Sequence, residues 1–111
     1  MFLLPLVNSI ANRGRWPSKI NDYLAAGRPV VASAVGDIAD LFARGRLGAL
    51  AGSEMEGLVT ACLELVDDPD QAAEIGRNAR MFAETELSWS QISAGFLATY
   101  EDALRRRAVF A

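Results

Sequence analysis

The sequence predicts an α/β fold in which a small parallel sheet is flanked by helices. Three short apolar segments, at residues 2–7, 30–34 and 47–51, have the length and composition of buried strands. Polar and helical patterns alternate with them, and this order is typical of parallel strands that helices cover on both faces. A chain of 111 residues, 51% of them hydrophobic, is long enough for a single domain over 1–111 with a modest core.

The first half of the chain is predicted to alternate strands with short helices. Pro17 suits the first position of a helix, Gly27 suits its end, and Pro29 precedes the apolar run that starts at Val30. The expected order of elements is strand 2–7, loop 8–15, helix 17–26, strand 30–34, helix 36–43 and strand 47–51.

The second half is predicted to be helical. Ser53 and Glu56 have the spacing of a capping box, whose two side chains accept hydrogen bonds from the free N–H groups at a helix start. The expected helices cover 53–66, 70–84 and a long last segment, which begins at a second capping box, Ser88 with Gln91, is lined by Ile92, Phe96, Tyr100 and Leu104, and ends in three arginines. The last helix, with Trp89 at its start, either docks on a partner or is solvated.

The composition excludes several kinds of chemistry. The chain has no histidine, which removes Ser-His-Asp triads, Cys-His pairs and histidine metal sites. Cys62 is the one cysteine, so no internal disulfide forms, and its place in an apolar helical pattern indicates a core residue. No metal and no cofactor is expected. The apolar start of the chain is too short for a membrane span, and we expect a cytoplasmic protein.

The charge is unevenly distributed along the chain. Residues 1–50 carry six basic and three acidic side chains, +3, whereas 51–111 carry five basic and eleven acidic ones, −6, within an overall charge of −3. The basic residues form no long stripe with interleaved aromatics, so a nucleic-acid partner is not expected.

A basic loop before the second predicted helix indicates an anion site. Lys19, the one lysine of the chain, falls in the first helical turn close to Arg13 and Arg15. Cations usually avoid a helix start because the helix dipole is already positive there. A bound anion would compensate the positive charge at this position. Lys19 as an ordinary solvated side chain remains the alternative. The loop also leaves the carboxyl end of a predicted strand, where parallel sheets bind ligands.

Five segments together resemble the carboxyl-terminal part of the donor-binding domain of group 1 glycosyltransferases, which have the GT-B fold. They are Leu3-Leu4-Pro5, residues 22–40 with the core A-x-G-x-P-V-V-A-S, Leu47-Gly-Ala-Leu50, Asp67-Asp-Pro69 followed by Gly76 and Ala79, and Ser88-Trp-Ser90. The resemblance covers nearly the whole chain and implies half of a Rossmann-like domain that binds a nucleotide-diphosphate sugar.

The resemblance also implies roles for single residues. Asp22 takes the position of the second glutamate of the family's E-x7-E motif and would accept hydrogen bonds from the ribose hydroxyls; the alternative is an exposed carboxylate paired with a nearby cation. The first glutamate falls at Gly14, which carries no carboxylate. In its place the chain has Gly14-Arg15-Trp16-Pro17-Ser18-Lys19.

This basic segment is the expected donor-binding site. Lys19, Ser18 and the helix N–H groups would hold the diphosphate, with Arg15 as a further cation. Trp16 would cover the sugar or the base, or would pack the loop onto the domain. Gly36 either permits close approach of the next loop or is an ordinary helix-entry glycine. No catalytic residue is assigned.

The expected function is therefore that of a glycosyltransferase fragment that binds the nucleotide-sugar donor. A GT-B enzyme has two domains, roughly three times this length, so no complete transferase activity is expected from this chain alone. The alternative is a non-catalytic interaction or nucleotide-sensing module that self-associates. Such a half-domain would expose a sheet edge, which the missing N-terminal domain or a second copy would cover.

Overall fold

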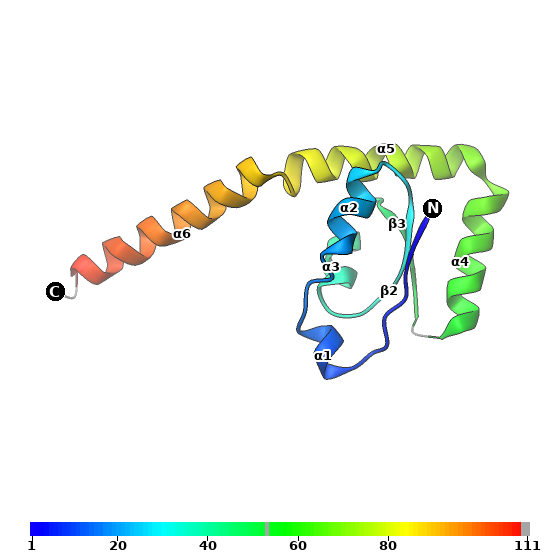
Figure 1. The fold of residues 1–111 in the computed structure, drawn as a ribbon, viewed down its shortest axis with the longest axis horizontal. Helices are drawn as coiled ribbons and strands as arrows, with labels where there is room; N and C mark the ends of the chain where they lie inside the picture. The colour runs from blue at the N-terminus through cyan, green and yellow to red at the C-terminus, as the bar shows by residue number, and fades with distance from the viewer. Residues whose placement is uncertain (53, 110–111) are drawn as a thin grey trace.

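Three parallel strands form the centre of the fold (Figure 1). The computed structural model describes residues 1–52 and 54–109. Its strands are β1 (Phe2–Leu4), β2 (Val30–Ser33) and β3 (Gly48–Ala51), in the order β1-β2-β3. Phe2 lies opposite Val30, and Val30 lies opposite Gly48. The described part of the chain thus confirms the expected α/β class with a small parallel sheet.

Helices follow each strand and continue to the end of the described chain. They are α1 (Ile10–Arg13), α2 (Lys19–Ala25), α3 (Asp37–Ala43), α4 (Met55–Asp67), α5 (Pro69–Glu86) and α6 (Trp89–Val109). None of these described helices is long and apolar enough to cross a membrane.

The alternation of side chains along β2 divides the core into two layers. Val30 and Ala32 face one layer, in which Ile20 of α2 and Ile38 of α3 are also fully buried or nearly so. Val31 faces the other layer, where α4 and the start of α5 cover the sheet. Both faces of β2 are covered, and its four residues are therefore all buried. Their small side chains fit between the sheet and the helices on either face.

Helix α5 lies across the end of the sheet at which the strands begin (Figure 1). It contacts the end of α2 closely, because both facing positions are glycine. Gly27 has φ +67, a conformation that glycine adopts without strain, and a Cβ on Gly76 would collide with the Gly27 carbonyl oxygen. Arg80 of α5 donates a hydrogen bond to the carbonyl of Ala25, which satisfies one free carbonyl at the end of α2.

The differences from the predicted elements are largest in the first part of the chain, whereas the later boundaries differ by one or two residues. The expected loop 8–15 contains α1, which is only four residues long and begins where the Ser9 side chain accepts a hydrogen bond from the Asn12 N–H. Strand β1 ends at Leu4, because the Leu6 N–H donates to the Ser33 hydroxyl (3.0 Å) and not to a β2 carbonyl. Helix α2 begins at Lys19, two residues later than expected.

The two predicted capping boxes have different outcomes. Ser88 Oγ accepts a hydrogen bond from the Gln91 N–H (3.4 Å) at the start of α6, as the spacing predicts. Ser53 lies outside the described residues, and α4 begins after Glu54.

Helix α6 extends away from the sheet and its helices (Figure 1). The molecule is accordingly elongated, with extents of 61 × 30 × 18 Å. The apolar residues predicted to line this helix do lie in α6, but they are largely exposed. Phe96, Tyr100 and Leu104 are each more than 60% exposed, and Trp89 at the start of the helix is 83% exposed. The apolar side of α6 therefore packs against no other part of the described chain over most of its length.

Candidate functional site

A pocket of about 450 Å³ lies at the carboxyl end of β1. This end of the sheet is opposite to the one that α5 crosses (Figure 1). Its walls come from the end of β1 and from the loop and first turns of α2. The lining residues are Leu3, Leu4, Pro5, Leu6, Arg15, Trp16, Pro17, Ser18, Lys19 and Tyr23. Four of the five predicted site residues, all except Asp22, are among them.

Two of the three predicted cations lie at this pocket. Lys19 and Arg15 line it and are exposed, and among the described residues neither forms an ion pair. Arg13 does not line the pocket, and its Nε donates to Asn8 Oδ1 at 2.7 Å. The expected cluster of three is therefore a pair of available cations and one arginine that holds the α1 loop.

Trp16 is fixed at the pocket by a side chain of α2. Its indole Nε1 donates to Asn21 Oδ1 at 3.2 Å, and its side chain is about half exposed, at 40%. The indole is therefore neither free in solvent nor buried in the core. It presents an aromatic surface beside Lys19, and both remain accessible to a ligand.

Tyr23 is a lining residue that the sequence analysis did not identify. Its ring stacks on Phe2 of β1, with ring centroids 4.4 Å apart and planes 5° from parallel. The stack ties α2 to β1 on either side of the pocket. The signal was present in the spacing, because Tyr23 follows Lys19 by four residues and so lies on the same side of the helix.

Two contacts hold the loops around the pocket in place. The Ser33 hydroxyl is buried and accepts the Leu6 N–H, which fixes the chain just beyond β1. Gly36, with φ +56, lies against Arg13, and a Cβ there would sit 2.7 Å from the Arg13 carbonyl oxygen. The structure shows both interpretations of Gly36, because it is the N-cap residue of α3 and also allows the close approach between the loops.

Asp22 lies beside the pocket but does not line it. It is exposed in the first turn of α2, three residues after Lys19. Within the described residues its carboxylate forms no ion pair, so the alternative of a paired surface carboxylate is not seen. Its oxygens are free to accept hydrogen bonds from a ligand that extends beyond the pocket.

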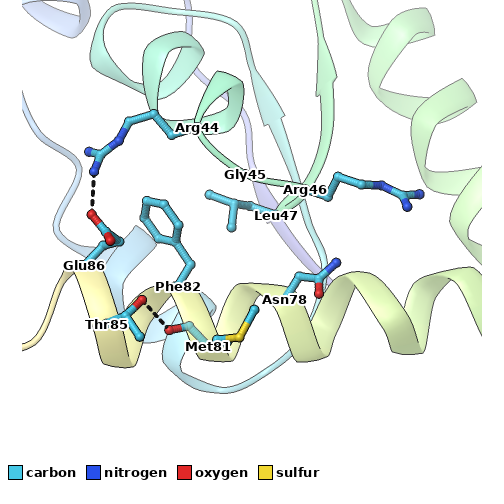
Figure 2. Close-up of a pocket in the computed structure, with 9 residues that line it drawn as sticks. All are labelled: Arg44, Gly45, Arg46, Leu47, Asn78, Met81, Phe82, Thr85 and Glu86. Atoms are coloured by element: carbon cyan, nitrogen blue, oxygen red, sulfur yellow. Dashed lines mark hydrogen bonds and ion pairs between the residues drawn. The ribbon is translucent and has the colours of Figure 1, made fainter.

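A larger pocket, of about 630 Å³, lies between α5 and the loop that precedes β3 (Figure 2). Its arginines already have partners. Arg44 pairs with Glu86 at 2.8 Å and lies over the Phe82 ring, 5.3 Å from its centroid, and Arg46 pairs with Glu74 at 3.3 Å. Because these charges are compensated and the pocket lies at the amino ends of the strands, it is less suited to an anion than the pocket at Lys19.

A small parallel sheet covered by helices defines an α/β protein, and open sheets of this class bind ligands at the carboxyl ends of their strands, where this pocket lies. The chain belongs to the glycosyl transferase-like family, whose model matches residues 2–98. This membership confirms the expected resemblance to group 1 glycosyltransferases of the GT-B fold.

The chain is also similar in sequence to individual glycosyltransferases. The chain is 42% identical over 82 residues to a D-inositol 3-phosphate glycosyltransferase of Gordonia bronchialis, covering 73% of this chain and 18% of that protein. It is 36% identical over 86 residues to the D-inositol 3-phosphate glycosyltransferase of Stackebrandtia nassauensis, covering 77% and 19%. The chain thus spans less than a fifth of the length of these curated relatives.

The fold is also similar to that of a solved structure. Sucrose-phosphate synthase from Thermosynechococcus elongatus matches with a TM-score of 0.73 at 24% identity, over 82% of this chain and 23% of that chain. At this level of identity the likeness concerns the fold.

Proposed function

We propose that the pocket at Lys19 binds the diphosphate of a nucleotide-sugar donor for glycosyl transfer. The observation that supports this most is the pair of available cations, Lys19 and Arg15, on a pocket at the carboxyl end of β1. Phosphate oxygens accept charge-assisted hydrogen bonds from such groups, and Ser18 adds a hydroxyl at the same wall. Membership of a glycosyltransferase family makes a nucleotide sugar the natural anion.

The other predicted residues contact the parts of the donor on either side of the diphosphate. Trp16 provides a ring surface for the sugar or the base, and Asp22, one turn along α2, accepts hydrogen bonds from the ribose hydroxyls. In glycosyl transfer the nucleoside diphosphate leaves, and negative charge develops on its oxygens. Cations held in place at the diphosphate stabilise that charge, which is the main contribution we assign to this chain.

In this proposal, sugar transfer requires a larger protein of which this chain forms a part. The relatives are named D-inositol 3-phosphate glycosyltransferases, and this chain matches less than a fifth of their length. We propose that the acceptor is bound by a second domain and that the 111 residues alone bind donor without transferring sugar. The site of action is proposed to be the cytoplasm.

Isothermal titration calorimetry with UDP, GDP and ADP tests donor binding. We expect saturable binding of at least one nucleotide, weakened about tenfold or more by Lys19→Ala, because removal of one charge-assisted contact costs about 1.5–3 kcal/mol. Arg46→Ala is the matched control, since it also removes one positive charge but lies at the other pocket. Asp22→Ala should weaken the binding of nucleotides but not that of inorganic pyrophosphate, which has no ribose.

Two results would count against this proposal. Absence of saturable binding for all three nucleotides would remove it. Equal effects of Lys19→Ala and Arg46→Ala would show that only net charge matters, and the pocket would lose its assignment.

A second candidate function rests on an apolar surface. Leu3 of β1 and Met55, Val59 and Leu63 of α4 are each at least half exposed, and several of them line a hollow of about 320 Å³ beside the open edge of β1. Such a surface favours an interaction module, covered by the remainder of a larger glycosyltransferase or by a second copy. Light scattering decides about the second copy: a dimer that Val59→Glu dissociates would support self-association, and a monomer at all concentrations would oppose it.

A further inference from the structure

We propose that Asn21 is a positioning residue that holds the Trp16 indole against the donor pocket, where the ring face stacks on a ring of the bound donor. The inference rests on the proposed function of the pocket and adds a role for a residue that neither the sequence motifs nor the family resemblance points to. It starts from the hydrogen bond between Trp16 Nε1 and Asn21 Oδ1 at 3.2 Å.

The hydrogen bond fixes a side chain that would otherwise rotate. Trp16 precedes α2 by three residues, in a loop segment, and Asn21 is half-buried in the first turn of that helix. An indole has a single polar donor, so one acceptor is enough to select among its orientations. Asn21 therefore transfers the rigidity of α2 to the ring.

The selected orientation places the ring where a donor would lie. Trp16 and Lys19 line the same pocket, so an aromatic face and an ammonium group are both available to one ligand. A diphosphate that carries a ring matches this pair, because the cation binds the charged part and the indole covers the ring. A ring held in advance loses less entropy on binding than a mobile one, which is how a residue without ligand contact raises affinity.

The chain offers a direct spectroscopic test. It has two tryptophans, so in a Trp89→Phe protein the fluorescence comes from Trp16 alone. We expect Asn21→Ala to increase acrylamide quenching of Trp16 and shift its emission, and Asn21→Asp, which keeps an oxygen acceptor, to retain the parent behaviour. Unchanged quenching in Asn21→Ala would overturn the inference.

A double-mutant cycle tests whether Asn21 acts through Trp16. In the Trp89→Phe background, Asn21→Ala should weaken binding of a nucleotide or of its glucose conjugate about three- to tenfold, the worth of one neutral hydrogen bond. The same substitution should have no further effect once Trp16 is replaced by alanine. Equal losses in both backgrounds would overturn the inference, because they would show an effect on α2 itself.

The choice of ligand identifies the ring and provides a control. UDP, GDP and ADP carry only the nucleoside ring, their glucose conjugates add the sugar, and inorganic pyrophosphate carries neither. A loss with the free nucleotides assigns Trp16 to the nucleoside, and a loss with the conjugates alone assigns it to the sugar. Pyrophosphate binding should be unchanged, and a matching loss there would also overturn the inference.

Failure of the inference and failure of the proposed function remain distinguishable. If the parent protein binds none of the three nucleotides, the proposed function fails. The quenching of Trp16 in Asn21→Ala and Asn21→Asp then still decides whether Asn21 holds the indole, because that measurement needs no ligand.

Discussion

The backbone carbonyl of Arg13 lies directly against Gly36, so that a Cβ at position 36 would stand 2.7 Å from its oxygen. Arg13 ends α1, beyond β1, and Gly36 precedes α3, beyond β2. The contact therefore joins the two loops that leave neighbouring strands at the end of the sheet that carries the Lys19 pocket. It depends on a residue without a side chain.

Substitution of Gly36 should destabilise the protein. Gly36→Ala introduces both a clash with Arg13 and a residue at φ +56, and we expect a loss of about 1–3 kcal/mol in the free energy of unfolding. Urea denaturation measures the loss. Gly14→Ala in the same loop region is the control, because its Cβ would be 3.7 Å from the Ile10 carbonyl oxygen, an ordinary contact, and should change stability by less than about 0.5 kcal/mol.

Two helical glycines should respond to alanine in opposite directions. In Gly76→Ala the new methyl group collides with the Gly27 carbonyl and separates α5 from α2, at a cost of about 2 kcal/mol or more. In Gly57→Ala of α4 the nearest atoms are 3.7 Å away, so helix propensity should stabilise the protein by about 0.5–1 kcal/mol. A loss of stability in both proteins would show that the α2–α5 contact is not the cause.

The hydroxyl of Ser33 should contribute substantially to the stability of the fold. Ser33→Ala leaves the Leu6 N–H without its acceptor in a buried position, and we expect a loss of about 1–3 kcal/mol, with faster hydrogen exchange at the Leu6 amide. Thr60→Ala serves as the control, because that hydroxyl donates to the Glu56 carbonyl on the exposed surface of α4. A change of similar size at Thr60 would contradict the assignment.

In the larger pocket, the buried side chain should contribute more stability than the ion pair (Figure 2). Arg44→Ala removes a pair with Glu86 in which both side chains are about half exposed, and should cost less than about 1 kcal/mol, decreasing with added salt. Leu47→Ala, at a position that is 1% exposed, should cost about 2–5 kcal/mol. The urea midpoints of the two variants decide between these contributions.

Removal of α6 should leave the remainder of the fold intact. A chain that ends at Ser88 retains the sheet and both core layers, because none of their buried residues comes from α6. We expect its urea midpoint to match that of the full chain, with a loss of helical circular dichroism in proportion to the residues removed. A large fall in the midpoint would show that α6 packs on the sheet domain.

The strands and the end of α2 could be predicted because their signals are local. The apolar run at Val30 gave β2, and Gly27 gave the end of α2. Helix α1 was missed because four residues are too few to show a helical period, and β1 was predicted too long because its pairing ends through the distant Ser33 side chain.

The lining of the pocket at Lys19 was predictable to the extent that it is contiguous in sequence. Arg15, Trp16, Ser18 and Lys19 form one segment, and that segment does line the pocket. The bond between Arg13 and Asn8 depends on how the loop folds, and no motif marks it. The pocket of Figure 2 brings together residues 44–47 and 78–86, whose proximity follows only from the packing of α5.

The position of α5 has a consequence for the motions of the sheet. This helix lies across the end of the sheet at which the strands begin and contacts β3 there, whereas loops bound the other end. Local unfolding should therefore begin at Ser33 and Ala51 and reach Val30 last. The protein would then keep its core closed while the loops at the Lys19 pocket open and close on their own.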